Sequence, residues 1–196
     1  MASYETLLVI KFSEMSQKIN LNDLCIDKSD RPGWSKVFGG LCAEAASVCL
    51  EKQGHINSST LHIDGDYSHK FEISWSEVTD EMHRFQNDDQ VAIEFGAYGI
   101  SALIIPKLTN LTIIERSKKG TGFDFWLGSI DDPAPLFQKK ARLEVSGIGN
   151  GTEKDIKSRV NTKLKQITPS DGSLPGYVSI VEFSAPCSRV VKKCKK

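Results

Sequence analysis

The sequence has no excess of charge of either sign. It contains 25 Lys and Arg residues and 25 Asp and Glu residues among 196, so its formal net charge at pH 7 is zero. A protein with balanced charges has no overall field that would draw it to nucleic acid or to an anionic membrane. Any surface that binds phosphate groups must therefore come from a local cluster of basic side chains.

Long hydrophobic runs and paired cysteine motifs are also absent. The longest apolar stretch, residues 91–106, is shorter than the about 20 residues that span a bilayer and it contains Glu94. The first residues hold no basic segment followed by an apolar run and a cleavage site, so we expect a soluble, cytoplasmic protein without a membrane partner. The five cysteines show neither C-x-x-C nor zinc-finger spacing, which indicates reduced thiols.

Several catalytic motifs are missing as well. The four histidines all lie in the first half of the chain, so no serine–histidine–aspartate arrangement can be recognised. The sequence SGIGNGT, residues 146–152, places three glycines between an expected strand and an expected helix, where a phosphate-binding turn would lie. It lacks the last glycine of G-x-G-x-x-G and the Gly-Lys-Ser/Thr end of a P-loop. A plain glycine-rich turn is therefore favoured over a nucleotide site.

The length suffices for one compact core, or for a core with a smaller subdomain. We divide the chain into an N-terminal extension, residues 1–87, and a second part, residues 88–196. The extension is expected to flank a sheet or to form a surface for a partner. Its pattern predicts a buried strand over residues 4–12, a loop over 13–32, a helix over 35–53, a hairpin from 60–63 and 70–75, and a short helix over 77–85.

The second part has the pattern of a helix, three strands, a helix and a strand. Its first helix is apolar, starts after Asp88 and is expected to end at Pro106. Thr152 and Asp155 form a T-x-x-D start for the second helix, which runs to residue 167. The strands are predicted over residues 111–116, 123–127, 141–146 and 177–183, with an acidic loop before the third and a short basic tail, VVKKCKK, after the fourth.

Two of these apolar strands each carry one acid. In GTGFDFWLG, alternation places Phe123 and Phe125 on one face and Asp124 on the other. In ARLEVSG, it places Glu144 on the polar face, together with Arg142. Carboxylates are rarely buried unless a counter-charge, hydrogen bonds or a metal compensates the loss of water. Two such acids on neighbouring strands predict a cation between them.

The order of elements and the positions of the acids resemble the PD-(D/E)xK nuclease superfamily, which has the restriction-endonuclease-like fold. In that family an aspartate on the second core strand and a glutamate on the third bind magnesium, and some branches add a glutamate from the first helix. The resemblance implies that Asp124, Glu144 and Glu94 are the metal ligands. It covers residues 88–196 and includes the sequence GTGFD, which is similar to the glycine-rich lead into the aspartate strand.

One position departs from the family pattern. The family's lysine two residues after the glutamate is replaced by Ser146, whose hydroxyl can orient water but has no positive charge. Lysines in such folds can sit elsewhere in the sequence and keep their place in space. Lys119, Lys140 and Arg142 are the candidates for the missing cation, and the last two share the face of Glu144. Ser146 and such a basic residue would together position water.

The resemblance implies an α/β protein that acts as a metal-dependent endonuclease on DNA, with defence against foreign DNA as one role of the superfamily. Carboxylate oxygens suit Mg²⁺ or Mn²⁺, which neutralise the charge that develops on phosphate during hydrolysis. The alternative is a non-catalytic protein of the same fold that binds nucleic acid or a protein partner, or that forms a homo-oligomer. Local basic groups would contact DNA; the candidates are Lys118, Lys119 and Lys157.

Overall fold

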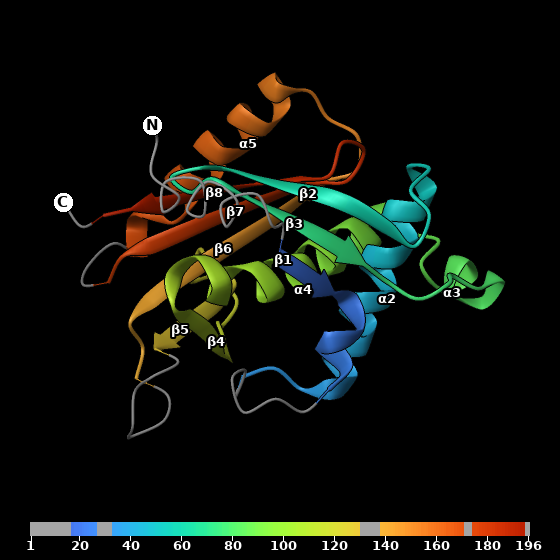
Figure 1. The fold of residues 1–196 in the computed structure, drawn as a ribbon. Helices are drawn as coiled ribbons and strands as arrows, with labels where there is room; N and C mark the ends of the chain where they lie inside the picture. Colours follow the sequence, from blue (N-terminus) through green and yellow to red (C-terminus); the bar gives the residue numbers. More distant parts are fainter. Residues whose placement is uncertain (1–16, 27–32, 130–137, 171–173, 195–196) are drawn as a thin grey trace, which may run out of the picture.

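The computed structural model describes residues 17–26, 33–129, 138–170 and 174–194. In these residues the chain forms a mixed α/β fold with an eight-stranded sheet in the order β1-β3-β2-β8-β7-β6-β5-β4, together with four α-helices (Figure 1). The strand predicted over residues 4–12 and the acidic loop of residues 130–137 lie outside the described residues.

The sheet takes strands from both parts of the sequence. Neighbouring strands are parallel in three pairs, β1 with β3, β2 with β8 and β6 with β7, and antiparallel in the other four. The bounds are β1 (Gln17–Asn20), β2 (Ser58–Gly65), β3 (His69–Ser74), β4 (Leu111–Arg116), β5 (Phe125–Ser129), β6 (Ala141–Ile148), β7 (Gly176–Glu182) and β8 (Cys187–Lys193).

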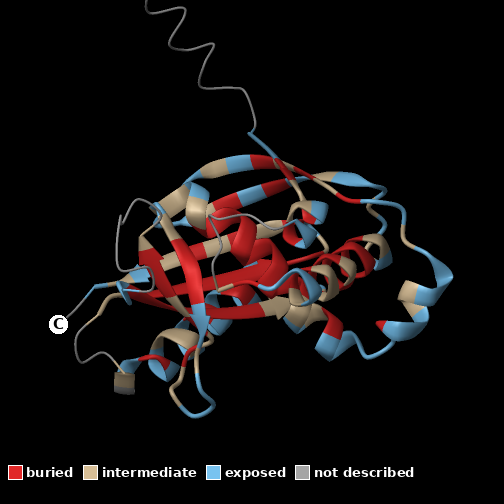
Figure 2. Cartoon of the chain, turned by 90° about the horizontal axis from the view of Figure 1, so that it is seen from below, coloured by how far each residue is buried: buried red, intermediate tan, exposed pale blue. Residues whose placement is uncertain are grey.

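Helices cover both faces of the sheet (Figures 1 and 2). The main core lies on the face covered by α2 (Lys36–Lys52) and α4 (Asp89–Thr109), and a smaller core lies under α5 (Glu153–Gln166) on the other face. The short α3 (Asp80–Phe85) connects β3 to α4. Although α4 is long and apolar enough to cross a membrane, 61% of its apolar 18-residue stretch is buried inside the protein, which is consistent with a soluble protein.

The predicted helices are confirmed, with shifted ends. Ser35 caps α2, and Thr152 and Asp155 cap α5 reciprocally as predicted. The predicted end of α4 at Pro106 is wrong, because the helix continues to Thr109 and stops at Asn110, which has a left-handed φ of 57°. A proline this near the end removes one hydrogen bond, while the buried residues before it hold the last turn in place.

The prediction of a basic tail over residues 190–196 is also wrong, because residues 190–193 belong to β8, a central strand between β7 and β2. Its alternate residues Ser188 and Val190 are fully buried, whereas Lys192 is exposed. Pairing on both sides supplies the backbone hydrogen bonds that overcome the weak strand preference of a lysine-rich segment. As a result the N-terminal hairpin joins the sheet through β8.

The loop predicted over residues 13–32 contains two regular elements in its described portion. These are β1, which pairs with β3, and a 3-10 helix (Leu21–Cys25). Leu21 and Leu24 of this helix are at most 1% exposed, so the segment contributes to the main core. β1 has only four residues, which are too few for an alternating apolar pattern to be recognised in the sequence.

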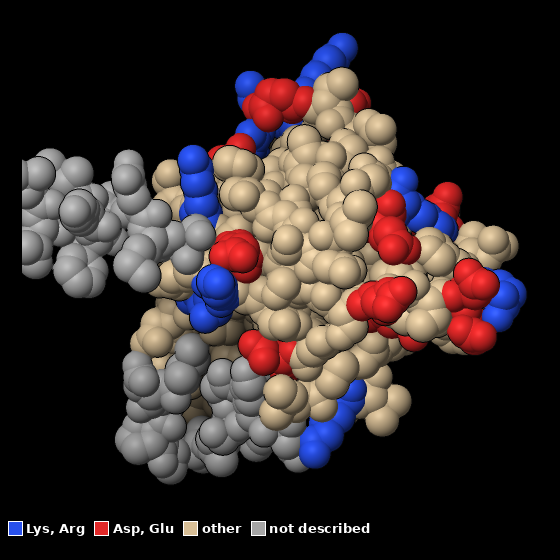
Figure 3. All heavy atoms as spheres, turned by 45° about the vertical axis from the view of Figure 1, so that its right-hand side comes forward, with Lys and Arg blue, Asp and Glu red and all other residues tan. Residues whose placement is uncertain are grey.

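Basic and acidic side chains are mixed on the one face of the molecule that Figure 3 shows. On the face shown in Figure 3, acidic and basic side chains lie interspersed around a largely uncharged centre. The described part of this face therefore shows no large patch of one charge sign.

Candidate functional site

A polar cavity opens where β5 and β6 separate. The two strands pair only from Leu127 with Ala141 to Phe125 with Leu143, and no described strand pairs with this edge of β6 beyond that point. The N–H of Arg142 bonds toward β7, so by alternation the odd-numbered residues of β6 direct their backbone groups to the open side. A cavity of about 650 Å³ lies along this edge.

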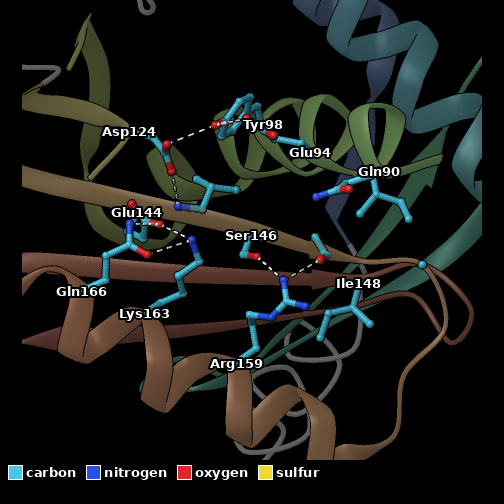
Figure 4. A pocket seen from close by; sticks show the side chains of 14 residues that line it. Gln90, Glu94, Tyr98, Asp124, Glu144, Ser146, Ile148, Arg159, Lys163 and Gln166 are labelled. Carbon is cyan, nitrogen blue, oxygen red and sulfur yellow. Dashed lines mark hydrogen bonds and ion pairs between the residues drawn. The ribbon is translucent and has the colours of Figure 1, made fainter. Parts of the chain in front are cut away.

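Three rows of side chains line the cavity (Figure 4). The row from α4 is acidic or neutral, and the row from α5 carries the basic groups; residues spaced by three or four lie on the same side of a helix. The rows are Gln90, Glu94 and Tyr98 on α4, residues 144–149 on and just after β6, and Arg159, Lys163 and Gln166 on α5. The cavity is therefore electrostatically polarised from one helix to the other.

Asp124 lies immediately before β5 and is held at both carboxylate oxygens. Oδ1 accepts a hydrogen bond from the hydroxyl of Tyr98 at 3.1 Å, and Oδ2 accepts one from the N–H of Val145 at 2.8 Å. Burial raises the pKa of Asp124, and these two donors oppose the rise. Gly122, with a φ of 83°, turns the chain into this position, where a side chain would collide with the carbonyl of Gln166.

The predicted alternation around Asp124 is only partly confirmed. Phe125 belongs to the main core, but Phe123 packs against Trp126 in the smaller core under α5, with their ring centroids 4.6 Å apart. Because β5 begins at Phe125, the period of two does not extend back to Phe123.

Glu144 is 2% exposed and lies on β6 beneath α5. Its Oε1 accepts hydrogen bonds from Lys163 Nζ at 2.5 Å and from Gln166 Nε2 at 2.9 Å, while no described residue donates to Oε2. Burial and the charge of Asp124 raise the pKa of Glu144 to about 7, against the opposing effect of Lys163. A buried carboxylate oxygen without a donor, close to a second acid, is suited to a cation or a proton.

Glu94 lies exposed at the rim and reaches Asp124 through Tyr98. The Tyr98 hydroxyl is 2.8 Å from Glu94 Oε1 and 3.1 Å from Asp124 Oδ1, so the two carboxylates share its single proton. Among the described residues, no group of three or more His, Cys, Asp or Glu side chains is close enough to hold a metal ion. The three predicted ligands thus share one cavity, but Glu94 stands apart from the other two.

Ser146 lines the cavity, and its Oγ accepts a hydrogen bond from Arg159 Nη1 at 2.8 Å. Arg142 shares the face of Glu144, but its guanidinium donates to the carbonyls of Ile167 at 3.0 Å and Leu174 at 2.8 Å. Arg142 therefore ties the end of α5 to the start of β7, and it does not belong to the described lining of the cavity.

The other predicted basic residues lie outside this lining. Lys140 is exposed just before β6, and Lys118 and Lys119 are in the turn between β4 and β5. Lys157 is exposed on α5 and forms an ion pair with Glu153 at 3.2 Å. The structure does not bring these four lysines together with the acids.

Sequence reasoning missed Lys163 as a site residue. Its side chain is 20% exposed and its Nζ is the closest positive group to Glu144. A signal was present, because residues 159, 163 and 166 lie beside the apolar stripe of 156, 160 and 167. That flank faces β6 once the helix packs on the sheet.

The chain has no match among family models, curated proteins or solved structures.

Proposed function

We propose that the chain is a metal-dependent nuclease that hydrolyses phosphodiester bonds in DNA, with α4, β4, β5, β6, α5 and β7 as a restriction-endonuclease-like core. The observation that carries the proposal is the pair of Asp124 and Glu144. The buried Glu144 and the half-buried Asp124 meet at a polar cavity, and one oxygen of Glu144 has no donor among the described residues. Such a pair is stabilised by a divalent cation.

The donor set fits Mg²⁺ or Mn²⁺, which bind through one or two carboxylates and otherwise keep water or phosphate oxygens as ligands. Asp124 and Glu144 would hold the ion directly, and Glu94 would take part through water from the rim. When bound, the ion supplies charge neutralisation at phosphate and an activated water. The Val145 N–H and the Tyr98 hydroxyl fix the orientation of Asp124.

Lys163 provides the positive charge that the strand lacks at Ser146. It approaches Glu144 from α5, so the ammonium group lies over the acids although its position in the sequence differs from the family pattern. A fixed positive group beside the reacting phosphate stabilises the charge that develops on it. Gln166, the second donor to Glu144, orients the same carboxylate.

The test is cleavage of supercoiled plasmid with Mg²⁺ or Mn²⁺ by the wild type and by Asp124→Asn, Glu144→Gln and Lys163→Ala. The two acid variants are expected to lose detectable cutting, and Lys163→Ala to lose about 100-fold, as when one charge-stabilising donor is removed. Lys154→Ala, on the same helix but outside the cavity, is the control and should cut normally. Cutting that persists in both acid variants would contradict the assignment.

A second outcome separates the alternative function. If the wild type binds DNA but cuts none with either metal, the chain is a binding protein with a nuclease-like fold. The ion pair between Lys163 and Glu144 is compatible with that outcome, because it already neutralises one of the two acids.

A further inference from the structure

Arg159 lies in the same cavity, one step along β6 from the acids, and the proposed mechanism does not use it. Its Nη1 donates to Ser146 Oγ at 2.8 Å and approaches the carbonyl of Gly147 at 3.4 Å. No described residue accepts a hydrogen bond from its Nε or Nη2, and no described carboxylate forms an ion pair with it. An exposed guanidinium with unused donors in a polar cavity is suited to an anion.

Facing side chains of α5 and β6 form two successive pairs along the cavity, because the residue spacings of the two elements match. We call Lys163 with Glu144 the first step and Arg159 with Ser146 the second step. Arg159 and Lys163 are four residues apart on α5, about 6 Å along its axis. Ser146 and Glu144 are two residues apart on β6, about 6.6 Å along the strand. Each basic side chain therefore contacts one β6 side chain, and the two contacts lie one after the other along the cavity (Figure 4).

The opposite wall differs between the two steps. Near the acids it carries Glu94 and Tyr98, whereas farther along, on the side of Arg159, it carries the neutral amide of Gln90 (Figure 4). Gly147 lies between the walls, where a Cβ would be only 2.5 Å from the carbonyl oxygen of Ile93. The second step thus combines a cation with a neutral wall, and the first combines a cation with the two acids Asp124 and Glu144.

We propose that Arg159 binds the phosphate next to the one that is cut, so that the ligand is a polynucleotide strand laid along β6 with at least two successive phosphates. This inference rests on the proposed function and adds a subsite to it. Ser146 fixes the guanidinium, and Nε and Nη2 remain to contact phosphate oxygens. Recognition at this subsite is independent of base sequence, because only the backbone is contacted.

Binding tests the subsite without catalysis. The probe is a fluorescein-labelled single-stranded oligothymidylate, titrated at several salt concentrations with Asp124→Asn protein that does or does not carry Arg159→Ala. The loss of Arg159 is expected to weaken binding about 10-fold and to reduce the salt slope by about 0.7, the value for one phosphate contact on a single strand. Lys154→Ala, an exposed position of α5 outside the cavity, should in the same background change the affinity less than about 2-fold.

Cleavage shows which phosphate Arg159 contacts. The Arg159→Ala change is expected to lower kcat/KM about 10-fold on the oligonucleotide and to leave hydrolysis of bis(p-nitrophenyl) phosphate, a diester with one phosphate, unchanged. An equal fall on both substrates would place Arg159 at the cut phosphate and overturn the proposal. Since the side chain is exposed, circular dichroism should confirm that Arg159→Ala folds normally.

The outcomes separate the two proposals. If the wild type neither binds nor cuts any nucleic acid, the proposed function fails and the subsite fails with it. If the wild type binds or cuts and Arg159→Ala behaves like it in both assays, only the subsite is refuted. If the wild type binds without cutting, the affinity and salt slope of the Arg159 variant decide on the subsite alone.

Discussion

Glu144 is the residue at which burial and charge conflict most. It is 2% exposed, it lies beside Asp124, and only one of its carboxylate oxygens accepts hydrogen bonds from described residues. The raised pKa values of Glu144 and Asp124 mean that the folded, metal-free protein holds a proton that the unfolded chain releases. This conflict predicts that the stability of the protein depends on pH and, if the proposed metal binds, on divalent cations.

The stability of the metal-free protein is expected to fall as pH rises. The pKa of Glu144 is about 7 in the folded state against 4.5 as its ordinary value, so the folded protein binds more protons between these pH values. Stability from this group is present below about pH 4.5 and is lost as pH passes 7, by at most on the order of 3 kcal/mol. Urea unfolding from pH 5 to pH 8 measures the slope, and Glu144→Gln should flatten it.

Mg²⁺ should reverse part of that loss if the acids hold the ion. A cation competes with the proton, so the rise in Tm with Mg²⁺ should be larger at pH 8 than at pH 6. Asp124→Asn should abolish the rise. If the free energy of unfolding changes with pH as steeply in Glu144→Gln as in the wild type, a group other than Glu144 is responsible for the pH dependence.

Tyr98 illustrates how one hydroxyl can organise two acids. Tyr98→Phe keeps the ring packed on Phe125, at 5.1 Å between centroids, and removes the contacts to Glu94 and Asp124. Cleavage should fall about 10-fold, as for other groups that orient metal ligands. Tyr177→Phe is a matched control, since both tyrosines are 4% exposed and Tyr177 lies outside the cavity. An equal loss in both variants would indicate a general effect on packing.

At the scale of elements, the site depends on two helices that hold their polar rows at β6. α4 is positioned by close packing against α2 and the sheet, where glycines allow the backbones to approach. α5 is positioned by its apolar stripe and by Arg142, which holds its last carbonyl. Neither relation is visible in the sequence of one element alone, because it depends on the partner surface.

Adjacent glycines in α2 give a sharp test of this packing. A Cβ at Gly39 would lie 1.9 Å from the carbonyl oxygen of Leu24, whereas at Gly40 the nearest atom is 3.8 Å away, on Cys25. Gly39→Ala should destabilise the protein by about 2 kcal/mol or more, because backbone must move to admit the methyl group.

Gly40→Ala is the control and should stabilise the protein by up to about 1 kcal/mol, since alanine favours the helix. Urea denaturation of both variants measures the difference. Equal effects in the two variants would mean that the 3-10 helix does not pack on α2 as described.

At the scale of the whole molecule, β8 joins the two parts of the chain. It pairs with β7 on one side and with β2 on the other, so the sheet is continuous from β1 to β4. The N-terminal part is therefore an extension of the sheet that carries the site. We expect the two parts to unfold together, because neither can lose β8 without exposing its own edge.

This linkage predicts the effect of a charge in β8. Val190→Asp places a carboxylate at a fully buried position and should unfold the strands on both sides of β8. Lys192→Ala changes an exposed side chain of the same strand and should leave stability within about 0.5 kcal/mol. Hydrogen exchange in β2 and β5 measures the effect, and loss of protection in only one of them would show that the parts unfold separately.

The sequence by itself determined most elements and the two acids at the centre of the site. Strong periodicity and capping residues identified α2, α4 and α5, and the cost of placing a carboxylate in an apolar strand singled out Asp124 and Glu144. These signals are local, because they depend on residues a few positions apart. The resemblance to nucleases added Glu94 and the expected metal, which remain predictions.

Only the tertiary structure decided which cations lie beside those acids. Arg142, two residues from Glu144, bonds to carbonyls at the end of α5, whereas Lys163 and Arg159 approach β6 from that helix. Which basic residues reach the acids depends on how α5 lies across the sheet. The residue spacing within a single segment carries no information on that packing. The central place of β8 was decided in the same way, by pairing partners that supply hydrogen bonds to a segment with weak strand preference.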